Sequence, residues 1–169
     1  MAHPLEEIMR AADGFLLIGE SGKDRFPGYS YNAFTQAKKR FYCLDLDGMT
    51  ESRGPTKGGK VYASVAELPD DHDDLAIIWV TPSSSARAVE VAKEAGCTRV
   101  WFSFGTASRQ AFVRAGELDV EVVEAGRCPI YYFSGAPAAC KGHTAMVRIS
   151  GTRRGKQRTT VEDRGREMW

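Results

Sequence analysis

Five short, predominantly apolar runs divide the chain. They cover residues 15–18, 41–46, 75–80, 100–104 and 120–123, and they lack the strict alternation of a strand that has one face in water. Apolar runs of this length are typical of strands that are covered on both faces in a parallel sheet. The pattern therefore predicts five buried strands, and a further short strand is expected over residues 61–62.

Between these runs, apolar residues recur at helical spacing. Helices are predicted over residues 4–12, 29–40 and 107–115, with Gly116 ending the last of these, and a fourth runs from a cap at 81–85 to Ala95. Because strands alternate with helices and crossovers between parallel strands are right-handed, the expected fold is α/β. We predict a Rossmann-like, doubly wound parallel sheet with three layers.

The alternation stops after Phe133, and this divides the chain into two predicted parts. Residues 1–133 are expected to form the α/β domain, and residues 134–169 a basic C-terminal extension in which only 145–149 look like a strand. The extension holds eight basic and three acidic residues, a net charge of +5. The whole chain carries +1, so the predicted domain is slightly acidic.

Composition narrows the range of partners. Lys and Arg number 23 against 22 acidic residues, which gives no basis for a nucleic-acid or anionic-membrane partner. No stretch has the apolar length of a membrane span, and the start lacks the pattern of a signal peptide, so a cytoplasmic location is expected. The four cysteines lie far apart, and no metal site is predicted. A small molecule is the expected partner, and the sequence leaves open whether the chain forms a homodimer.

The loop after the first strand carries the residue types that bind phosphate. Gly19 and Gly22 let the backbone approach a ligand closely, and Ser21 offers a hydroxyl group. Lys23 and Arg25 supply positive charge. Ligands of open α/β sheets bind at the carboxyl ends of the strands where the chain order reverses, which is where this loop is expected. The spacing lacks the third glycine of the dinucleotide fingerprint, so an ordinary strand-to-helix turn is the alternative.

Charged residues also follow the second strand. Asp45 and Asp47 occupy the region where an acid accepts hydrogen bonds from an adenosine ribose, although either could be a solvated loop acid. Just beyond them comes a cluster suited to a ribose-linked phosphate, for which a plain surface loop is the alternative. This cluster consists of Arg53, Pro55, Lys57 and Lys60.

Taken in order, these stretches resemble the CoA-binding domain family, which includes stand-alone bacterial proteins and the amino-terminal domain of the succinyl-CoA synthetase alpha subunit. The resemblance covers residues 14–133. It rests on Gly19-x-x-Gly22-Lys23, on Pro-Thr-Lys-Gly-Gly at 55–59, on Trp-Val-Thr-Pro at 79–82 and on the stretch from Trp101 to Gly105. The Arg-Cys-Pro sequence at 127–129 resembles the end of the stand-alone members.

The resemblance implies coenzyme A, or an acyl-CoA, as the cofactor. Residues 19–25 would hold its phosphates, Pro55 and Lys57 would lie near its adenine and phosphorylated ribose, and residues Val80, Thr81 and Pro82 would flank the pantetheine. Asp45 departs from the family, whose stand-alone members carry Asn-Pro near this point, and Glu20 is an anion beside the presumed phosphates. These departures keep NAD(P) as the alternative cofactor.

No catalytic group of residues stands out in the sequence, so an enzymatic role is not expected. His3, His72 and His143 are scattered, and each is expected to be an ordinary surface histidine. Cys128 follows the last strand and is interpreted either as a contact for the cofactor thiol or as a buried structural cysteine. The sequence predicts a CoA-binding protein that acts as a binding or regulatory module. The alternatives are an NAD(P)-binding oxidoreductase or redox sensor, and a protein-interaction module with a vestigial nucleotide site.

Overall fold

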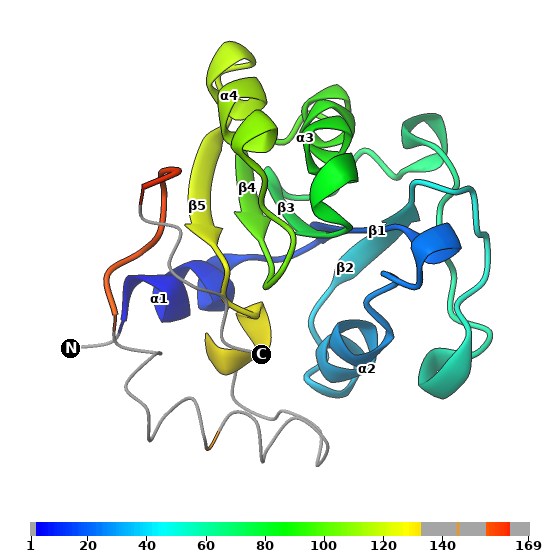
Figure 1. The fold of residues 1–169 in the computed structure, drawn as a ribbon. Coiled ribbons are helices and arrows are strands. Elements are labelled where there is room, and N and C mark those ends of the chain that lie inside the picture. Colours follow the sequence, from blue (N-terminus) through cyan, green and yellow to red (C-terminus); the bar gives the residue numbers. More distant parts are fainter. Residues whose placement is uncertain (1–2, 133–144, 146–154, 163–169) are drawn as a thin grey trace.

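The computed structural model describes residues 3–132, 145 and 155–162, and it shows a parallel sheet with helices on both faces (Figure 1). The sheet has five strands in the order β2-β1-β3-β4-β5, and every neighbouring pair is parallel. The strands are β1 (Phe15–Gly19), β2 (Phe41–Asp45), β3 (Leu75–Trp79), β4 (Arg99–Phe102) and β5 (Glu121–Ala125). The α-helices are α1 (Pro4–Ala11), α2 (Gly28–Gln36), α3 (Ser85–Glu94) and α4 (Arg109–Glu117). The predicted fold class is confirmed.

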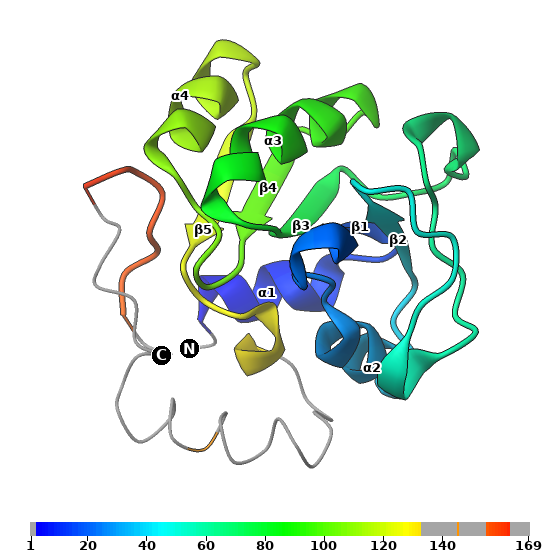
Figure 2. The same ribbon diagram turned by 45° about the vertical axis from the view of Figure 1, so that its right-hand side comes forward.

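The two faces of the sheet bury separate hydrophobic cores. Phe15 and Leu17 of β1 belong to the core that includes residues of α1 and α2. Leu16 and Ile18 belong to the core that includes residues of α3 and α4. Successive side chains of a strand point to opposite faces, so an unbroken apolar run is what a strand in a middle layer requires. Figure 2 shows the sheet between these two pairs of helices, which gives the three layers that the sequence predicts.

The order of the strands reverses beside β1. The chain passes from β1 to β2 on one side and then crosses to β3 on the other. Gly19, the last residue of β1, therefore pairs with Asp45 of β2 and with Trp79 of β3. The loops that leave the strands diverge at such a reversal, and ligands of open α/β sheets bind there.

Helix α2 is shorter than predicted. It ends at Gln36 rather than at residue 40, because Lys38 adopts a positive φ of 55°. The Lys39 ammonium group donates hydrogen bonds of 2.8 and 2.9 Å to the carbonyl oxygens of Arg10 and Ala12, at the end of α1. This contact joins the turn after α2 to the end of α1.

Helix α4 runs past its predicted end. Gly116 lies inside the helix, and the turn that follows is made by Asp119, which has a φ of 53°. The strand predicted over residues 61–62 is an isolated parallel bridge between Tyr62 and Leu44. Within the described part of the chain, no helix combines the length and the apolar character that crossing a bilayer requires.

The end of β5 carries a buried ion pair. Arg127 donates through Nη1 to the Glu124 carboxylate over 3.0 Å, and the side chains are 3% and 0% exposed. Two residues of the C-terminal extension contact this pair. The Lys156 carbonyl accepts a hydrogen bond of 2.9 Å from Arg127, and the Arg158 N–H donates one of 3.2 Å to Glu124. This part of the extension therefore packs on the domain at the edge strand of the sheet.

A second contact of the extension lies at the start of the chain. His3 accepts a hydrogen bond from the Leu5 N–H through Nδ1, which caps α1, and its Nε2 lies 3.2 Å from the Gly155 carbonyl oxygen. The division of the chain at residue 133 stays a prediction. The strand expected over 145–149 falls, apart from Ala145, outside the described residues.

Candidate functional site

The candidate site is the loop that leaves β1 at the strand-order reversal. Residues 20–25 turn there through the short 3₁₀-helix η1 (Ser21–Lys23) and lead towards α2. A Cβ atom on Gly19 would lie 2.8 Å from Cδ of Pro27, so only glycine fits where the loop begins. The predicted phosphate loop therefore occupies the expected place. Most of its hydrogen-bonding groups, however, already have partners within the protein.

Asp45 holds this loop from the end of β2. Its carboxylate is completely buried and accepts hydrogen bonds of 2.7 Å from both the backbone N–H and the hydroxyl of Ser21. It also accepts hydrogen bonds from the N–H groups of Asp47 and Met49, at 3.2 and 2.9 Å. Four donors from two loops thus converge on one carboxylate, which has no exposed surface for a ribose hydroxyl.

A second carboxylate, that of Asp47, accepts a hydrogen bond from the next backbone amide of the loop. The Gly22 N–H donates a 2.7 Å hydrogen bond to Oδ2 of Asp47. A Cβ atom on Gly22 would lie only 2.9 Å from the same oxygen, so this close approach needs glycine. Asp47 is exposed, in contrast to Asp45, and a ligand anion could replace it on the Gly22 amide.

Glu20 is the third carboxylate of the site, and it is 3% exposed. It accepts hydrogen bonds from Thr81 and Ser84, which lie in the loop and the 3₁₀-helix after β3, and it forms a 2.9 Å ion pair with Lys23. Burial raises the pKa of Glu20, but the hydrogen bonds from Ser84, Lys23 and Thr81 outweigh this effect. They lower the pKa from 4.5 to about 2. Glu20 is therefore ionised and balances the charge of Lys23.

Arg25 links the ends of β3 and β4. Its Nη2 donates to the carbonyl oxygens of Gly105 at 2.7 Å, Phe104 at 3.2 Å and Val80 at 3.4 Å. The guanidinium group lies 4.9 Å from the ring centre of Trp79, and its buried Nε has no hydrogen-bond partner among the described residues. Gly105 has a φ of +63°, and a Cβ there would lie 3.1 Å from Nη2. Arg25 is thus largely engaged in holding two strand ends together.

A hollow of about 490 Å³ lies along the segment that follows β2. It is lined by residues 48–54 and Lys57, which follow Asp47 along the chain. Arg53 and Lys57 are both exposed and give the lining two cations, against the single carboxylate of Glu51. The volume is within the range of small-molecule sites. Pro55, predicted to lie near the adenine, belongs to the adjoining 3₁₀-helix η2 (Gly54–Thr56).

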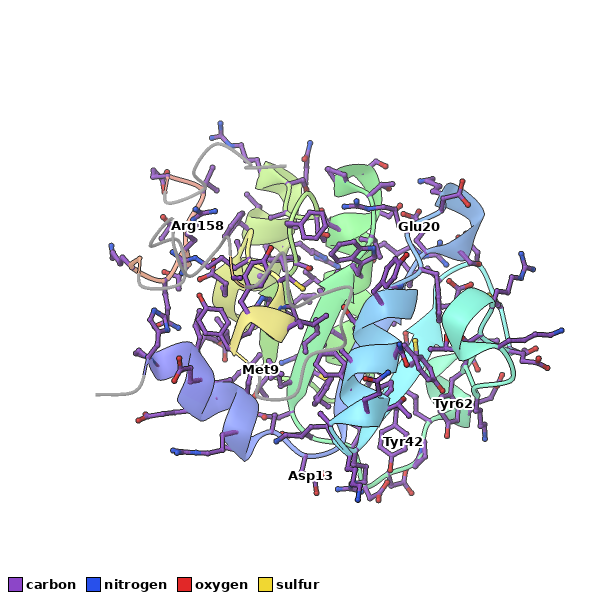
Figure 3. All side chains as sticks on the ribbon, turned by 90° about the horizontal axis from the view of Figure 1, so that it is seen from below. Met9, Asp13, Glu20, Tyr42, Tyr62 and Arg158 are labelled. Carbon is purple, nitrogen blue, oxygen red and sulfur yellow. The ribbon has the colours of Figure 1, made fainter. Side chains whose placement is uncertain are left out.

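The structure brings most of the predicted residues to one edge of the sheet. Thr81 and Pro82 follow β3 there, next to the loop of residues 20–25, and Figure 3 shows Glu20 at the opposite end of the molecule from Asp13 and Tyr42. Lys60 turns towards Tyr62, with Nζ 4.4 Å from the ring centre. The loop of residues 20–25 and the turn after β3 therefore form one candidate surface, and the segment that lines the hollow begins at the same edge of the sheet, after β2.

Cys128 lies after the edge strand of the sheet. It follows β5, which β4 separates from β3, and it is 7% exposed within the core that includes α1 and α2. Cys43 and Cys97 are buried as well, and burial raises the pKa of both thiols, that of Cys97 to about 12. The contact between Cys128 and a cofactor thiol stays a prediction.

The sequence interpretation missed the pairing of Glu20 with Ser84. The sequence pattern places Ser84 in a helix cap and Glu20 beside the presumed phosphates, where its negative charge is unfavourable. The one signal in the sequence was an acid placed inside a loop with two cations. Its partners could not be read from the sequence, because Thr81 and Ser84 lie more than sixty residues away.

Comparison with known proteins settles the family. The model of a family described as "CoA binding domain" matches residues 15–133, which is more than half of the chain. The chain belongs to the CoA-binding domain family. No significant match was found among curated proteins. The matched residues of this CoA-binding domain begin with β1 and extend one residue beyond the 3₁₀-helix that follows β5.

Solved structures share the fold of this CoA-binding domain. A hypothetical protein from Pyrococcus horikoshii OT3 is 26% identical, with a TM-score of 0.62, over 76% of this chain and 86% of that one. A conserved hypothetical protein from Pyrococcus furiosus is 23% identical, with a TM-score of 0.52, over 69% and 95%. A Thermus thermophilus protein is 16% identical, with a TM-score of 0.58, over 77% and 96%. The last two similarities concern the fold alone.

Proposed function

We propose that this chain binds coenzyme A and acts as a non-catalytic binding or regulatory module. The observation that carries the proposal is the family match over residues 15–133. The geometry supports it, because the loop after β1 lies at the strand-order reversal and the segment after β2 lines a hollow that carries two cations. Cations at this place suit a ligand that carries a phosphate on its ribose.

In this proposal each part of the cofactor has a defined place. The adenosine with its 3′-phosphate occupies the hollow near Arg53 and Lys57, and the diphosphate lies against the amides and Lys23 of η1. The pantetheine then follows the turn from Val80 to Pro82. Arg25 and Gly105 support this turn by joining the ends of β3 and β4.

The environment of Asp45 favours CoA over NAD(P). An NAD-type site uses a strand-end acid as an acceptor for ribose hydroxyl groups. Asp45 has the right position in the chain, but its carboxylate is fully buried and already accepts four hydrogen bonds from the protein. We therefore place CoA first and keep NAD(P) as a comparison ligand in the experiment.

Calorimetric titration with CoA, dephospho-CoA, NAD and NADP tests this function. We expect CoA to bind most tightly, and we expect dephospho-CoA to lose about tenfold in affinity, because it lacks the 3′-phosphate that Lys57 would contact. Lys57→Ala should weaken the binding of CoA but leave that of dephospho-CoA nearly unchanged. Lys93→Ala is the matched control, since Lys93 is an exposed lysine in the last turn of α3.

Two results would overturn the assignment. NAD or NADP binding as tightly as CoA would support a dinucleotide-binding protein instead. No binding of any of the four ligands would support an interaction module whose nucleotide site is vestigial.

A further inference from the structure

Three residues of the site direct hydrogen-bond donors at the carboxylate of Glu20. Its Oε2 accepts hydrogen bonds from the backbone N–H and the hydroxyl of Thr81, at 2.9 and 2.8 Å. Its Oε1 accepts a hydrogen bond from the Ser84 hydroxyl and lies 2.9 Å from the Lys23 ammonium group. The Lys23 ammonium group also donates to the Ser84 hydroxyl over 3.1 Å, so the donors form one connected set.

This donor set has the composition of an anion site. A backbone amide, two hydroxyl groups and an ammonium group are what proteins direct at a bound phosphate or carboxylate. Here all of them converge on a carboxylate of the protein that is 3% exposed. Side chains of Glu are almost never buried to this degree unless they are paired. The site thus already contains an anion, and the protein supplies it.

We propose that Glu20 is a specificity-determining residue, an internal anion that keeps small free anions such as inorganic phosphate off the donors of Thr81, Ser84 and Lys23. The inference rests on the proposed function, because exclusion matters if a cofactor phosphate is to bind next to these donors. Its physical basis is charge balance. Glu20 is paired with Lys23, and a second anion at the same donors would be repelled by the buried carboxylate.

The arrangement also directs where a cofactor diphosphate can bind. Glu20 and Ser84 engage two of the three N–H donors of Lys23, so its half-exposed ammonium group can still contact a diphosphate. The Gly22 amide can do so as well once the exposed Asp47 releases it. Free phosphate would bind only weakly to these groups alone. A tethered diphosphate gains the rest of its affinity from the adenosine and pantetheine.

Removing the internal anion tests the inference directly. In Glu20→Ala we expect inorganic phosphate and formate to bind about tenfold or more tightly than to the wild-type chain, since vacated charge-assisted donors are worth at least this much. Dissociation constants come from calorimetry, and a rise in Tm with added anion gives a second reading. Glu94→Ala is the matched control, because it removes an exposed glutamate from the far end of α3.

The Glu20→Gln variant keeps the size of the side chain and covers the case in which Glu20→Ala does not fold. Without the negative charge, it too should bind phosphate more tightly than the wild-type chain or Glu94→Ala. If phosphate and formate bind every folded variant as weakly as the wild-type chain, Glu20 does not exclude anions and the inference is wrong.

The CoA titration of the wild-type chain separates this inference from the proposed function. Failure of the wild-type chain to bind CoA would remove the function while leaving the phosphate result to decide the role of Glu20. When the wild-type chain does bind CoA, we expect millimolar phosphate to compete with CoA in Glu20→Ala but not in the wild-type chain. Competition of equal strength in both chains would overturn the inference.

Discussion

At the scale of single residues, the candidate site is defined by carboxylates that bind the groups expected to bind a ligand. Asp45 takes the amide and hydroxyl of Ser21, and Asp47 takes the amide of Gly22. The sequence correctly indicated where this loop lies, because the apolar run and the glycines around it are local signals. It could not indicate that the loop is already hydrogen-bonded, since these contacts join residues that are 24 and 25 positions apart.

Asp47 differs from Asp45 in a way that gives a testable result. It is exposed and holds the loop through the single Gly22 amide, so a diphosphate that uses this amide has to displace it. Asp47→Asn removes a negative charge beside the ligand and weakens the competing hydrogen bond. We expect the Kd for CoA to fall by about threefold to tenfold in calorimetry. Asp119→Asn, an exposed change after α4, serves as the control, and a higher Kd in Asp47→Asn would contradict the expectation.

The lowered pKa of Glu20 predicts a dependence of stability on pH. The pKa is about 2 in the folded chain, below the ordinary value of 4.5, so the stabilising contribution is fully present above pH 4.5. It is lost as the pH falls from 4.5 towards 2, because the carboxylate then becomes protonated. Urea unfolding of the wild-type chain and Glu20→Gln should therefore show a difference in free energy that is constant near neutral pH and closes in this acidic range.

Comparison with Glu20→Gln is necessary because another carboxylate titrates in the same range. Asp74 at the amino edge of the sheet has a pKa lowered to about 2 by hydrogen bonds from Arg99 and Thr98. Its contribution is common to both chains and cancels in the difference. A gap between the two chains that stays unchanged down to pH 2 would show that Glu20 is not stabilised as the structure indicates.

At the scale of elements, the strands and most helix ends were predictable to within one or two residues, and the end of α2 was not. Buried strands leave an apolar run that can be read locally. The end of α2 depends instead on Lys39, whose side chain reaches the last carbonyls of α1, and on the left-handed conformation of Lys38. Tertiary contacts of this kind override local preference.

The ion pair at the end of β5 is the clearest energetic feature of a single element. Glu124 and Arg127 are both buried, and the Glu124 Oε1 and Arg127 Nε atoms lack hydrogen-bond partners within the described part of the chain. Burial raises the pKa of Glu124, and the charge of Arg127 only partly offsets this. The pair is therefore coupled: each charge depends on the other to stay buried.

Substitutions of Glu124 and Arg127 should have effects on the free energy of unfolding that depend strongly on each other. Arg127→Met leaves Glu124 buried without its cation, and we expect the free energy of unfolding to fall by about 3–5 kcal/mol. The double variant Glu124→Leu with Arg127→Met should recover most of this loss, because two apolar side chains replace both charges. Urea denaturation of the wild-type chain, both single variants and the double variant measures the coupling. If the losses in free energy of unfolding of the two single variants simply add in the double variant, the two residues are not coupled.

At the scale of the whole molecule, the strand order decides which residues can work together. Reversal between β1 and β3 brings the loop of residues 20–25, the turn after β3 and the hollow after β2 to one edge. This convergence could be predicted from the alternation of strands and helices, because the rule for open α/β sheets does not require a known ligand. The same strand order places β4 between β3 and β5, the strand that Cys128 follows. The sequence alone does not give this order.

Trp79 at the end of β3 and Trp101 within β4 give this molecule a fluorescent reporter with an internal reference. Trp79 is partly exposed beside the candidate site, with Arg25 over its ring and the edge of Phe104 at 4.3 Å between ring centres. Trp101 is fully buried, and its Nε1 donates a 2.7 Å hydrogen bond to the Arg127 carbonyl oxygen. Ligands that rearrange Arg25 should change the emission of Trp79 and leave that of Trp101 unaltered.

The measurement uses a Trp169→Phe background, since Trp169 lies outside the described residues. We expect CoA to shift the emission maximum and to reduce quenching by iodide, and we expect Trp79→Phe to abolish both effects while the blue emission of Trp101 persists. A spectral change that survives in Trp79→Phe would mean that the ligand acts on the chain away from the turn after β3. The fluorescence of a single residue thus reports whether the cofactor has reached the strand ends.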